Sequence, residues 1–512
     1  MQKMILPVLL LSTFTCFSQK EDPAALFAQK IAAASMKEKL TILAGPEMEG
    51  RETATPGQKK AAAYIEQQFK KLGLKPGNGE SYQQVYPVYK DEISGKKIQV
   101  NGLNFEWDKD FSIALRGQAF GEWKYTNIVF AGYGLVDSAS KINDYAGMDV
   151  KGQMVMVLDG APSGFSPSGM GRRFISPASV FGKIAAARKA GAAGVLVITN
   201  DFPKKTATVT QGDMYLKNQA TGFFSASISA KIASALIGRT MSLSNDEFKQ
   251  VAKGKYISEL NIVCNKTTEQ LESSNVIAIL PGTDKKEEYV FLTGHYDHLG
   301  KRGEVIYYGA DDDGSGTVGV IQMAEAFVSA ANKGFRPRRS IVFMTVSGEE
   351  KGLWGSEYYS DHPIYPLDKT SVDLNTDMIG RVDTERKSAD TLNYIYVIGH
   401  DKLSSELPVI NEGVNNKYTK LTLDYKYDDP KDQNQIYYRS DHYNFAKKGV
   451  PILFFYDGML QADYHKPTDT VEKINFELME KRTRLVFHTA WEMANREDML
   501  KRDTPLNMPS TR

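Results

Sequence analysis

Cysteine is nearly absent from this sequence, and the two that it has, Cys16 and Cys264, lie far apart. A metal site built on thiolates needs several cysteines at short spacing, so a metal ion here has to bind histidine and carboxylate side chains. If Cys16 is removed with an N-terminal signal, the mature chain has a single thiol and no internal disulfide.

Neither sign of charge is in excess, because 63 lysines and arginines stand against 62 aspartates and glutamates and the net charge is +1. This balance gives no reason to expect a nucleic-acid partner or a charged membrane surface as partner. Long apolar runs are also missing after the N-terminus, so we predict no transmembrane segment. Composition does not address the oligomeric state.

The N-terminus carries the one long apolar run, from Met4 to about Phe17, directly after Lys3. The run is too short to span a bilayer comfortably, and small or polar residues follow it. It predicts a cleaved signal peptide over residues 1–19 and a secreted or periplasmic protein. Cys16 offers the alternative of a lipid-anchored protein, which Thr15 and the bulky Phe14 before it disfavour.

The 512 residues suffice for several domains. We predict an N-terminal part of the catalytic region at 20–123, an insert at 124–255, the catalytic domain at 256–500 and a tail at 501–512. The chain after about Asp498 is expected to fray. Two helical patterns within 36–76 flank the loop GRETATPG, which either lies near a site or only connects the helices.

From about Glu259 onward, strand and helix patterns alternate regularly. Residues 315–332 and 475–495 are predicted as amphipathic helices, and strands are predicted at NVIAILPG, YVFLTG, SIVFMTV, SVDLNT and VPILFFY. This alternation predicts an α/β fold with a mostly parallel central sheet flanked by helices.

Five segments carry histidines or carboxylates at or just after predicted strand ends: GHYDHLG (His295, Asp297), GADDDGSGT (Asp311 to Asp313), SGEEKGLWGS (Glu349, Glu350), NTDMIGR (Asp377) and YHKPTDT (His465). An isolated H-x-D or Glu-Glu pair is a weak signal. Their occurrence in order within one α/β unit is stronger, because the carboxyl ends of parallel strands meet at one sheet edge, where ligands bind.

Charge favours two metal ions at this edge. Two divalent ions would offset three carboxylates and one hydroxide, whereas the carboxylates alone would repel one another. Imidazole with carboxylate favours zinc over calcium or magnesium. Adjacent side chains at a strand end point in different directions, so one of Glu349 and Glu350 can bind metal while the other acts as general base.

These motifs, in this order, resemble the M28 family of zinc aminopeptidases, which use two co-catalytic zinc ions; the resemblance runs from about 259 to 495. It implies that one zinc ion binds His295 and Asp377, the other binds Glu350 and His465, and Asp312 bridges the two. The expected function is hydrolysis of the N-terminal peptide bond of peptides.

The same resemblance implies catalytic roles for three further residues. Glu349 would be the general base, Asp297 would orient His295, and Tyr464 would help to stabilise the tetrahedral oxyanion. Asp313 matches the residue after the bridging aspartate, which is often joined to it by a cis peptide bond.

The insert resembles a protease-associated (PA) domain. The similarity rests on GYG, on D-x-x-G-x-D-V-K-G before a strand, and on K-x-x-x-A-x-x-x-G-A-x-G-V-L-V. These motifs are loose, and an unrelated small α/β insert is the alternative. Residues 125–255 contain no histidine or cysteine, so we expect no catalytic residues there.

The remaining histidines match no ligand position in the family: His298, His362, His400, His442 and His488. We expect His298 at the surface or behind the ligands, because the metal set is complete without it. Ser440 to His442 lie in a segment that resembles one bordering the family's substrate pocket, where they either touch substrate or support the structure.

Other functions stay open at this point. A carboxypeptidase or an N-acyl-amino-acid amidohydrolase could use the same two-zinc site. The related M20 hydrolases insert a dimerisation domain after the Glu-Glu segment, and the stretch from Glu350 to His465 leaves little room for one. A one-zinc glutaminyl cyclase fits less well, and a binding module that has lost catalysis would lack a ligand or the base.

Overall fold

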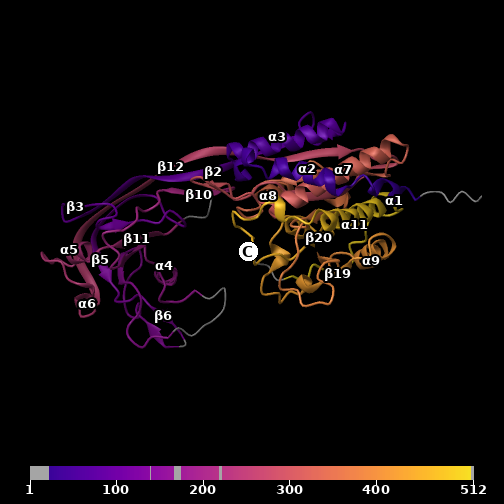
Figure 1. Ribbon diagram of the computed structural model, residues 1–512. Helices are drawn as coiled ribbons and strands as arrows, with labels where there is room; N and C mark the ends of the chain where they lie inside the picture. The colour runs from indigo at the N-terminus through magenta and orange to yellow at the C-terminus, as the bar shows by residue number, and fades with distance from the viewer. Residues whose placement is uncertain (1–21, 139, 167–174, 218–221, 509–512) are drawn as a thin grey trace, which may run out of the picture. The chain divides into compact units, whose positions relative to one another are not determined.

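The structure is a computed structural model that describes residues 22–138, 140–166, 175–217 and 222–508 (Figure 1). The predicted signal peptide, including Cys16, lies outside these residues. The chain divides into two compact units: the first joins the chain up to Tyr86 to the chain from Ser273 onward, and the second is Pro87–Glu272. No helix within the described ranges is both long and apolar enough to cross a membrane.

The first unit is built on a mostly parallel sheet with the strand order β19-β18-β20-β17-β13-β16-β12. Strands β20, β17, β13 and β16 run parallel, while β12 pairs antiparallel to β16 and β18 antiparallel to β20. The strands are β12 (Gly254–Leu280), β13 (Lys285–His295), β16 (Arg339–Val346), β17 (Thr370–Thr376), β18 (Tyr394–Ile398), β19 (Thr422–Asp424) and β20 (Ile452–Tyr456).

Helices cover both faces of this sheet (Figure 1). They are α1 (Pro23–Ala28), α2 (Ala33–Leu43), α3 (Pro56–Lys71), α7 (Gly316–Asn332), α8 (Trp354–Asp361), α9 (Leu407–Tyr418), α10 (His442–Lys447) and α11 (Phe476–Asn495). Two short pairs complete the unit: β14 (Lys301–Arg302) with β15 (Val305–Ile306), and β1 (Lys75–Pro76) with β12.

Alternate residues of each central strand enter different hydrophobic cores, because successive side chains of a strand point to opposite faces. In β13, Val290 and Leu292 pack with α2, α3, α7 and α11, whereas Phe291 packs with α8 and α10. Both faces are apolar, which explains why these strands read as continuous hydrophobic runs. The predicted α/β fold with a mostly parallel sheet is confirmed.

Polar residues start the helices that cover the first core. Thr55 caps α3 by accepting the Gln58 N–H, and Pro56 follows as the first helical residue. Asn475 caps α11 in the same way by accepting the Leu478 N–H. The loop before α3 is therefore fixed at its C-terminal end.

The second unit contains a smaller sheet in which β12 continues through β5, β8, β9 and β11 to β4. Strands β5, β8, β9 and β11 are parallel neighbours. Its elements are β2 (Gln83–Val100), β3 (Leu103–Phe105), β4 (Phe111–Ser112), β5 (Gly121–Phe130), β6 (Val136–Asp137), β7 (Ile142–Asn143), β8 (Met154–Leu158), α4 (Val180–Lys189), β9 (Gly194–Ile198), β10 (Gln211–Tyr215), β11 (Phe224–Ile228), α5 (Ala230–Leu236) and α6 (Asn245–Phe248).

Two boundaries differ from the sequence predictions. The second unit begins at Pro87 and ends at Glu272 rather than covering 124–255, because β2 pairs with β3, β10 and β12 and so joins the smaller sheet. The chain after Asp498 does not fray at once. Leu500 is buried, its N–H donates to Ser371, and Arg502 donates to the carbonyls of Leu367 and Thr370.

Candidate active site

Three of the predicted site segments lie at the carboxyl edge of the parallel strands. His295 is the last residue of β13, Asp377 directly follows β17, and Glu349 and Glu350 follow β16. Because these three strands are parallel neighbours, their carboxyl ends bring the side chains to one place.

The other two ligand candidates do not come from strand ends, which corrects the sequence prediction. Asp312 lies in the turn η2 (Ala310–Ser315) that leads into helix α7, and His465 lies in the loop after β20. The Asp312–Asp313 peptide bond is cis. The turn is held by Asp469, whose carboxylate accepts the N–H groups of Asp311 and Asp312.

Asp312 faces a different histidine with each of its carboxylate oxygens. Its Oδ1 lies 3.3 Å from Nε2 of His295, which is also 3.6 Å from Oδ1 of Asp377. Its Oδ2 lies 3.2 Å from Nε2 of His465, which is 3.0 Å from Oε2 of Glu350. The side chains therefore form two adjacent groups that share Asp312.

His298 lies beside the second of these groups, so of its two predicted positions, at the surface or behind the ligands, the surface is excluded. Its side chain is fully buried, and its Nδ1 lies 2.8 Å from Oε1 of Glu350 and 3.9 Å from Oδ2 of Asp312. The backbone accounts for this position, because the His298 N–H donates to the carbonyl of Arg51 in the N-terminal loop. Local sequence could not reveal a contact with a segment so distant along the chain.

The donor atoms of both groups fit divalent cations. Nε2 of His295, Oδ2 of Asp312 and Oε1 of Glu350 are buried and have no hydrogen-bond partner within the described residues. Unpaired buried groups of this kind are costly, and the carboxylates among them repel one another unless cations are present. Imidazole and carboxylate donors suit zinc. Thiolate does not take part, because Cys264 is buried in the core of the second unit.

A further group of His400, Asp401 and Asp428 lies elsewhere in the first unit. The ammonium group of Lys402 donates to both aspartates, and His400 contacts Asp428. The ammonium group of Lys402 thus offsets the negative charge that a metal ion would otherwise balance in this group.

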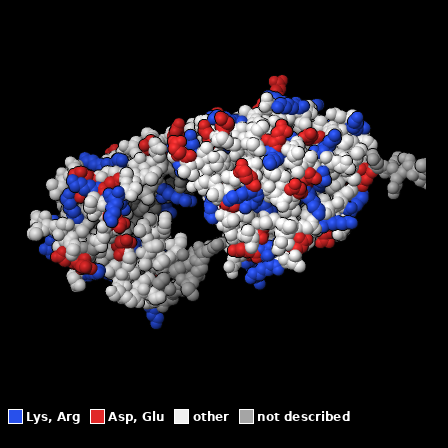
Figure 2. Space-filling view, viewed as in Figure 1, with Lys and Arg blue, Asp and Glu red and all other residues white. Residues whose placement is uncertain are grey.

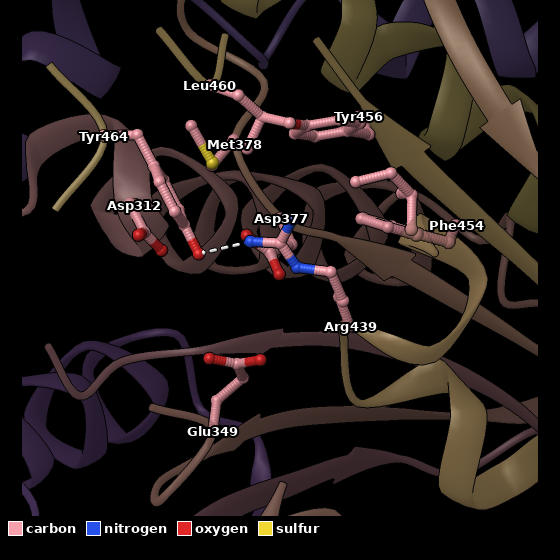
Figure 3. A pocket seen from close by; sticks show the side chains of 10 residues that line it. Asp312, Glu349, Asp377, Met378, Arg439, Phe454, Tyr456, Leu460 and Tyr464 are labelled. Atoms are coloured by element: carbon pink, nitrogen blue, oxygen red, sulfur yellow. Dashed lines mark hydrogen bonds between the residues drawn. The ribbon is translucent and has the colours of Figure 1, made fainter. Parts of the chain in front are cut away.

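Glu349 belongs to neither group of ligand candidates, but it lies next to them. Its Oε2 lies 3.8 Å from Nε2 of His295, and its carboxylate turns toward the side of the pocket that holds Asp312, Asp377 and Tyr464 (Figure 3). Burial raises the pKa of the Glu349 carboxyl; His295 opposes this shift, and the charges of Glu350 and Asp377 reinforce it. A carboxylate of raised pKa is suited to accept and return a proton.

Asp297 links the first ligand to the candidate base. Its Oδ1 accepts the Glu349 N–H at 3.2 Å and lies 3.6 Å from Nδ1 of His295. Its Oδ2 accepts the hydroxyl of Thr53 at 2.6 Å. Thr53 belongs to the loop GRETATPG, so this loop lies at the site and is more than a connection between helices.

Arg51 anchors the same loop, and sequence reasoning missed it. Its guanidinium is fully buried and donates to the carbonyls of Leu43, Tyr296, Tyr308 and Gly309. Four aligned carbonyls explain why a buried cation is tolerated here, although burial lowers its pKa to about 10.

Asp313 ties three parts of the site together. Its carboxylate accepts the N–H groups of His295, Gly316 and Met378, at 3.0, 2.8 and 3.0 Å. These residues belong to the end of β13, the start of α7 and the segment after β17. Asp313 thus fixes the spacing of three site segments.

A pocket with about 320 Å³ of empty space opens beside the ligands. Its polar lining is Asp312, Glu349, Asp377, Arg439 and Tyr464, and its apolar lining is Met378, Ile436, Phe454, Tyr456 and Leu460 (Figure 3). Nη2 of Arg439 donates to the hydroxyl oxygen of Tyr464 at 2.8 Å. The arginine therefore holds this hydroxyl at the pocket wall.

The segment next to Arg439 supports the structure and does not line the pocket. Ser440 accepts a hydrogen bond from Asn375, Asp441 accepts one from Ser356, and His442 donates to the carbonyl of Tyr437. Burial lowers the pKa of His442 to about 3, so its ring is neutral. Of the two alternatives predicted for Ser440 to His442, these contacts agree with structural support, and the residue of this segment that lines the pocket is the preceding Arg439.

Residues 275–490 match the model of "Peptidase family M28". A probable leucine aminopeptidase of Trichophyton verrucosum (strain HKI 0517) is 30% identical over 226 residues, which cover 43% of this chain and 57% of that protein. The chain thus spans less than two thirds of this curated relative.

Two solved structures resemble the whole chain. An aminopeptidase from Aneurinibacillus sp. strain AM-1 is 19% identical with a TM-score of 0.53, covering 96% of this chain and 100% of that one. A zinc aminopeptidase from Bacillus subtilis is 20% identical with a TM-score of 0.50, covering 93% and 99%. At these identities the likeness concerns the fold.

Proposed function

Because residues 275–490 belong to peptidase family M28, we propose that this protein is a metallo-aminopeptidase that removes the N-terminal residue of peptides with two zinc ions. The observation that carries the proposal is the position of Asp312, whose two carboxylate oxygens face two separate groups of ligand candidates. The names of the relatives, a leucine aminopeptidase and a zinc aminopeptidase, support it.

The residues present fit two zinc ions. His295 and Asp377 would hold one ion, Glu350 and His465 would hold the other, and Asp312 would bridge them. Zinc bound there would polarise the carbonyl of the substrate and lower the pKa of the attacking water.

Glu349 is the general base in this proposal. Its carboxylate would accept a proton from the attacking water and pass it to the nitrogen of the leaving amine, so that the peptide bond breaks with no net proton change at the enzyme. The Asp297 carboxylate accepts the backbone N–H of Glu349, and the Asp297 backbone carbonyl lies 3.1 Å from Nδ1 of His295, where it accepts a hydrogen bond from the ring. Asp297 thereby fixes the base and the histidine relative to each other.

Tyr464 and Arg439 act on the substrate oxygen. The Arg439 guanidinium donates to the Tyr464 oxygen, which leaves the phenolic O–H free to donate to the carbonyl oxygen as negative charge develops there. Burial raises the pKa of Tyr464, so the hydroxyl keeps its proton at neutral pH.

The apolar part of the pocket supports an apolar N-terminal residue. Met378, Ile436, Phe454, Tyr456 and Leu460 form its wall. The acidic groups Glu349 and Asp377 lie in the same pocket, where they would attract the protonated α-amine of a peptide.

Arg439 favours one second candidate, a carboxypeptidase or N-acyl-amino-acid amidohydrolase. A guanidinium in the pocket is the preferred partner of a substrate carboxylate. The hydrogen bond to Tyr464 uses one of the five N–H groups of the Arg439 guanidinium, which leaves others able to bind a substrate carboxylate.

The test is a comparison of substrates with a free and with a blocked amine. The purified chain is assayed with leucine p-nitroanilide, with its N-acetylated form and with N-acetylated leucine, before and after removal of metal by a chelator. We expect cleavage of the free-amine anilide alone, loss of activity with chelator and recovery with added zinc. Hydrolysis of the blocked substrates without cleavage of the free-amine anilide would overturn the aminopeptidase proposal.

We also propose that the second unit is a PA-like accessory domain and that the protein is secreted or periplasmic. The three histidine and carboxylate groups able to hold a metal in the described part of the chain all lie in the first unit, which supports a non-catalytic role for the second. Expression of the full sequence followed by cell fractionation tests the location. Recovery of the uncleaved chain from the cytoplasm would contradict it.

A further inference from the structure

His298 occupies a buried position beside the second group of ligand candidates. Its N–H donates to the carbonyl of Arg51, and its ring packs against Gly309, where an added Cβ would come within 2.5 Å of the ring. The ring is edge-on to that of His465, with the centroids 5.9 Å apart. Backbone and ring are thus both held at a fixed place next to Glu350.

Four buried atoms at this place lack any hydrogen-bond partner within the described residues: Nδ1 and Nε2 of His298, Oδ2 of Asp312 and Oε1 of Glu350. The three residues come from different segments, and each offers a donor atom within 4.8 Å of a donor atom of the other two. Nδ1 of His298 approaches Oε1 of Glu350 to 2.8 Å without the alignment of a hydrogen bond. An unprotonated Nδ1 and a carboxylate oxygen both present lone pairs, so at this distance they repel, and either a proton on Nδ1 or a metal cation bound by both atoms removes the repulsion.

From this arrangement we infer that His298 is a further ligand of the second zinc ion, bound through Nδ1. The inference rests on the proposed two-zinc function and adds a nitrogen donor to it. The second position then has four protein ligands, namely Asp312, Glu350, His465 and His298, whereas the first has His295, Asp312 and Asp377. Three protein ligands leave an open coordination place, so the two ions differ in their freedom to accept water or substrate.

The direct experiment is a crystal structure of the zinc-loaded wild-type protein, with anomalous data at the zinc edge. We expect two peaks, with Nδ1 of His298 about 2.0–2.1 Å from the one that lies between Glu350 and His465. Two peaks with His298 more than about 3 Å from both would overturn the inference and leave the two-zinc proposal standing. A single peak would overturn both.

A solution measurement complements the crystal structure. In His298→Ala, zinc titration against a competing chelator is expected to show at least about a tenfold weaker affinity for one of the two equivalents and an unchanged affinity for the other. His298→Gln serves as the larger replacement if the alanine variant folds poorly, judged by circular dichroism. His362→Ala is the matched control, because His362 is exposed, belongs to neither ligand group, and its ring stacks on Tyr358 and hydrogen-bonds the Tyr358 carbonyl. Equal affinity of both equivalents in either His298 variant and wild type would contradict the inference.

Discussion

Thr53 is the residue through which the N-terminal loop contacts the candidate active site. Its hydroxyl donates to Oδ2 of Asp297 at 2.6 Å, and both side chains are fully buried. Asp297 in turn holds the Glu349 N–H. In the proposed mechanism the loop would contribute to catalysis by holding Asp297 in place.

Thr53→Val tests this contact with a side chain of nearly the same shape. The buried Asp297 oxygen loses its donor, so its carboxylate is no longer fixed. We expect kcat for an aminoacyl anilide to fall about tenfold, because residues behind metal ligands typically act at this scale. Thr41→Val is the control, since its exposed hydroxyl bonds only the Lys37 carbonyl. Equal kcat values for the two variants would show that the Thr53 contact is not used.

At the scale of elements, the start of α7 packs tightly against the end of β17. A Cβ at Gly316 would lie 2.2 Å from the carbonyl oxygen of Thr376 and 2.4 Å from Oδ1 of Asp313. These are backbone and ligand-supporting atoms that cannot move aside without shifting the site. The glycine is therefore required for close approach and not for an unusual φ.

Gly316→Ala is expected to lower the free energy of unfolding by about 1–3 kcal/mol, the usual cost of overpacking. Gly413→Ala is the opposite case, because Gly413 lies in α9 and an added Cβ meets nothing within 4 Å. It should raise the free energy of unfolding by about 0.5–1 kcal/mol. Urea unfolding followed by circular dichroism measures both, and changes of the same sign would contradict this account of the α7 start.

Helix α4 buries Lys183, whose ammonium donates to the carbonyls of Tyr133 and Gly160 at 2.6 and 2.7 Å. Burial lowers the pKa of this amine to about 8, whereas an unfolded lysine has a pKa of about 10.4. The unfolded chain therefore holds this proton more tightly between these two values. The free energy of unfolding should rise with pH over this window and carry the full cost of the buried charge below about pH 8.

Lys183→Met removes this titration. The difference in unfolding free energy, wild type minus variant, should increase by about 3 kcal/mol at most between about pH 7.5 and pH 10.5. Urea unfolding at several pH values measures it. A difference that stays flat over this range would show that Lys183 keeps its ordinary pKa in the folded protein.

At the scale of the whole molecule, the described ligand candidates and the pocket all belong to the first unit. Basic and acidic side chains are interspersed on the face of this unit that is in view (Figure 2).

Zinc binding should stabilise the first unit, because it relieves the repulsion among the buried carboxylates of the site.

Hydrogen exchange with and without zinc tests this division. We expect slower exchange in the loops around His295, Asp312, Glu350, Asp377 and His465. Exchange within Pro87–Glu272 should stay unchanged. Zinc-dependent protection that is confined to the second unit would contradict the placement of the metal site.

Much of the fold could be predicted from the sequence, because both faces of the central strands are apolar and their helices follow in regular order. The site segments and their order could also be predicted, since each motif is short and local. Contacts between segments that are distant along the chain could not be predicted from the sequence. Thr53 reaches Asp297, Arg51 holds the backbone around His298, and Arg439 meets Tyr464 only after folding. Asp312 was misplaced at a strand end because a polar turn before a helix has a similar pattern.

Central to the proposed mechanism is that the adjacent glutamates have different roles: Glu349 acts as general base and Glu350 binds zinc. Glu349→Gln and Glu350→Gln, compared for zinc content and for kcat with leucine p-nitroanilide, test it most directly. Glu349→Gln should keep both zinc ions and lose at least about a hundredfold in kcat, whereas Glu350→Gln should lose one zinc ion. Near-normal turnover of Glu349→Gln, or equal zinc loss in both variants, would contradict the account.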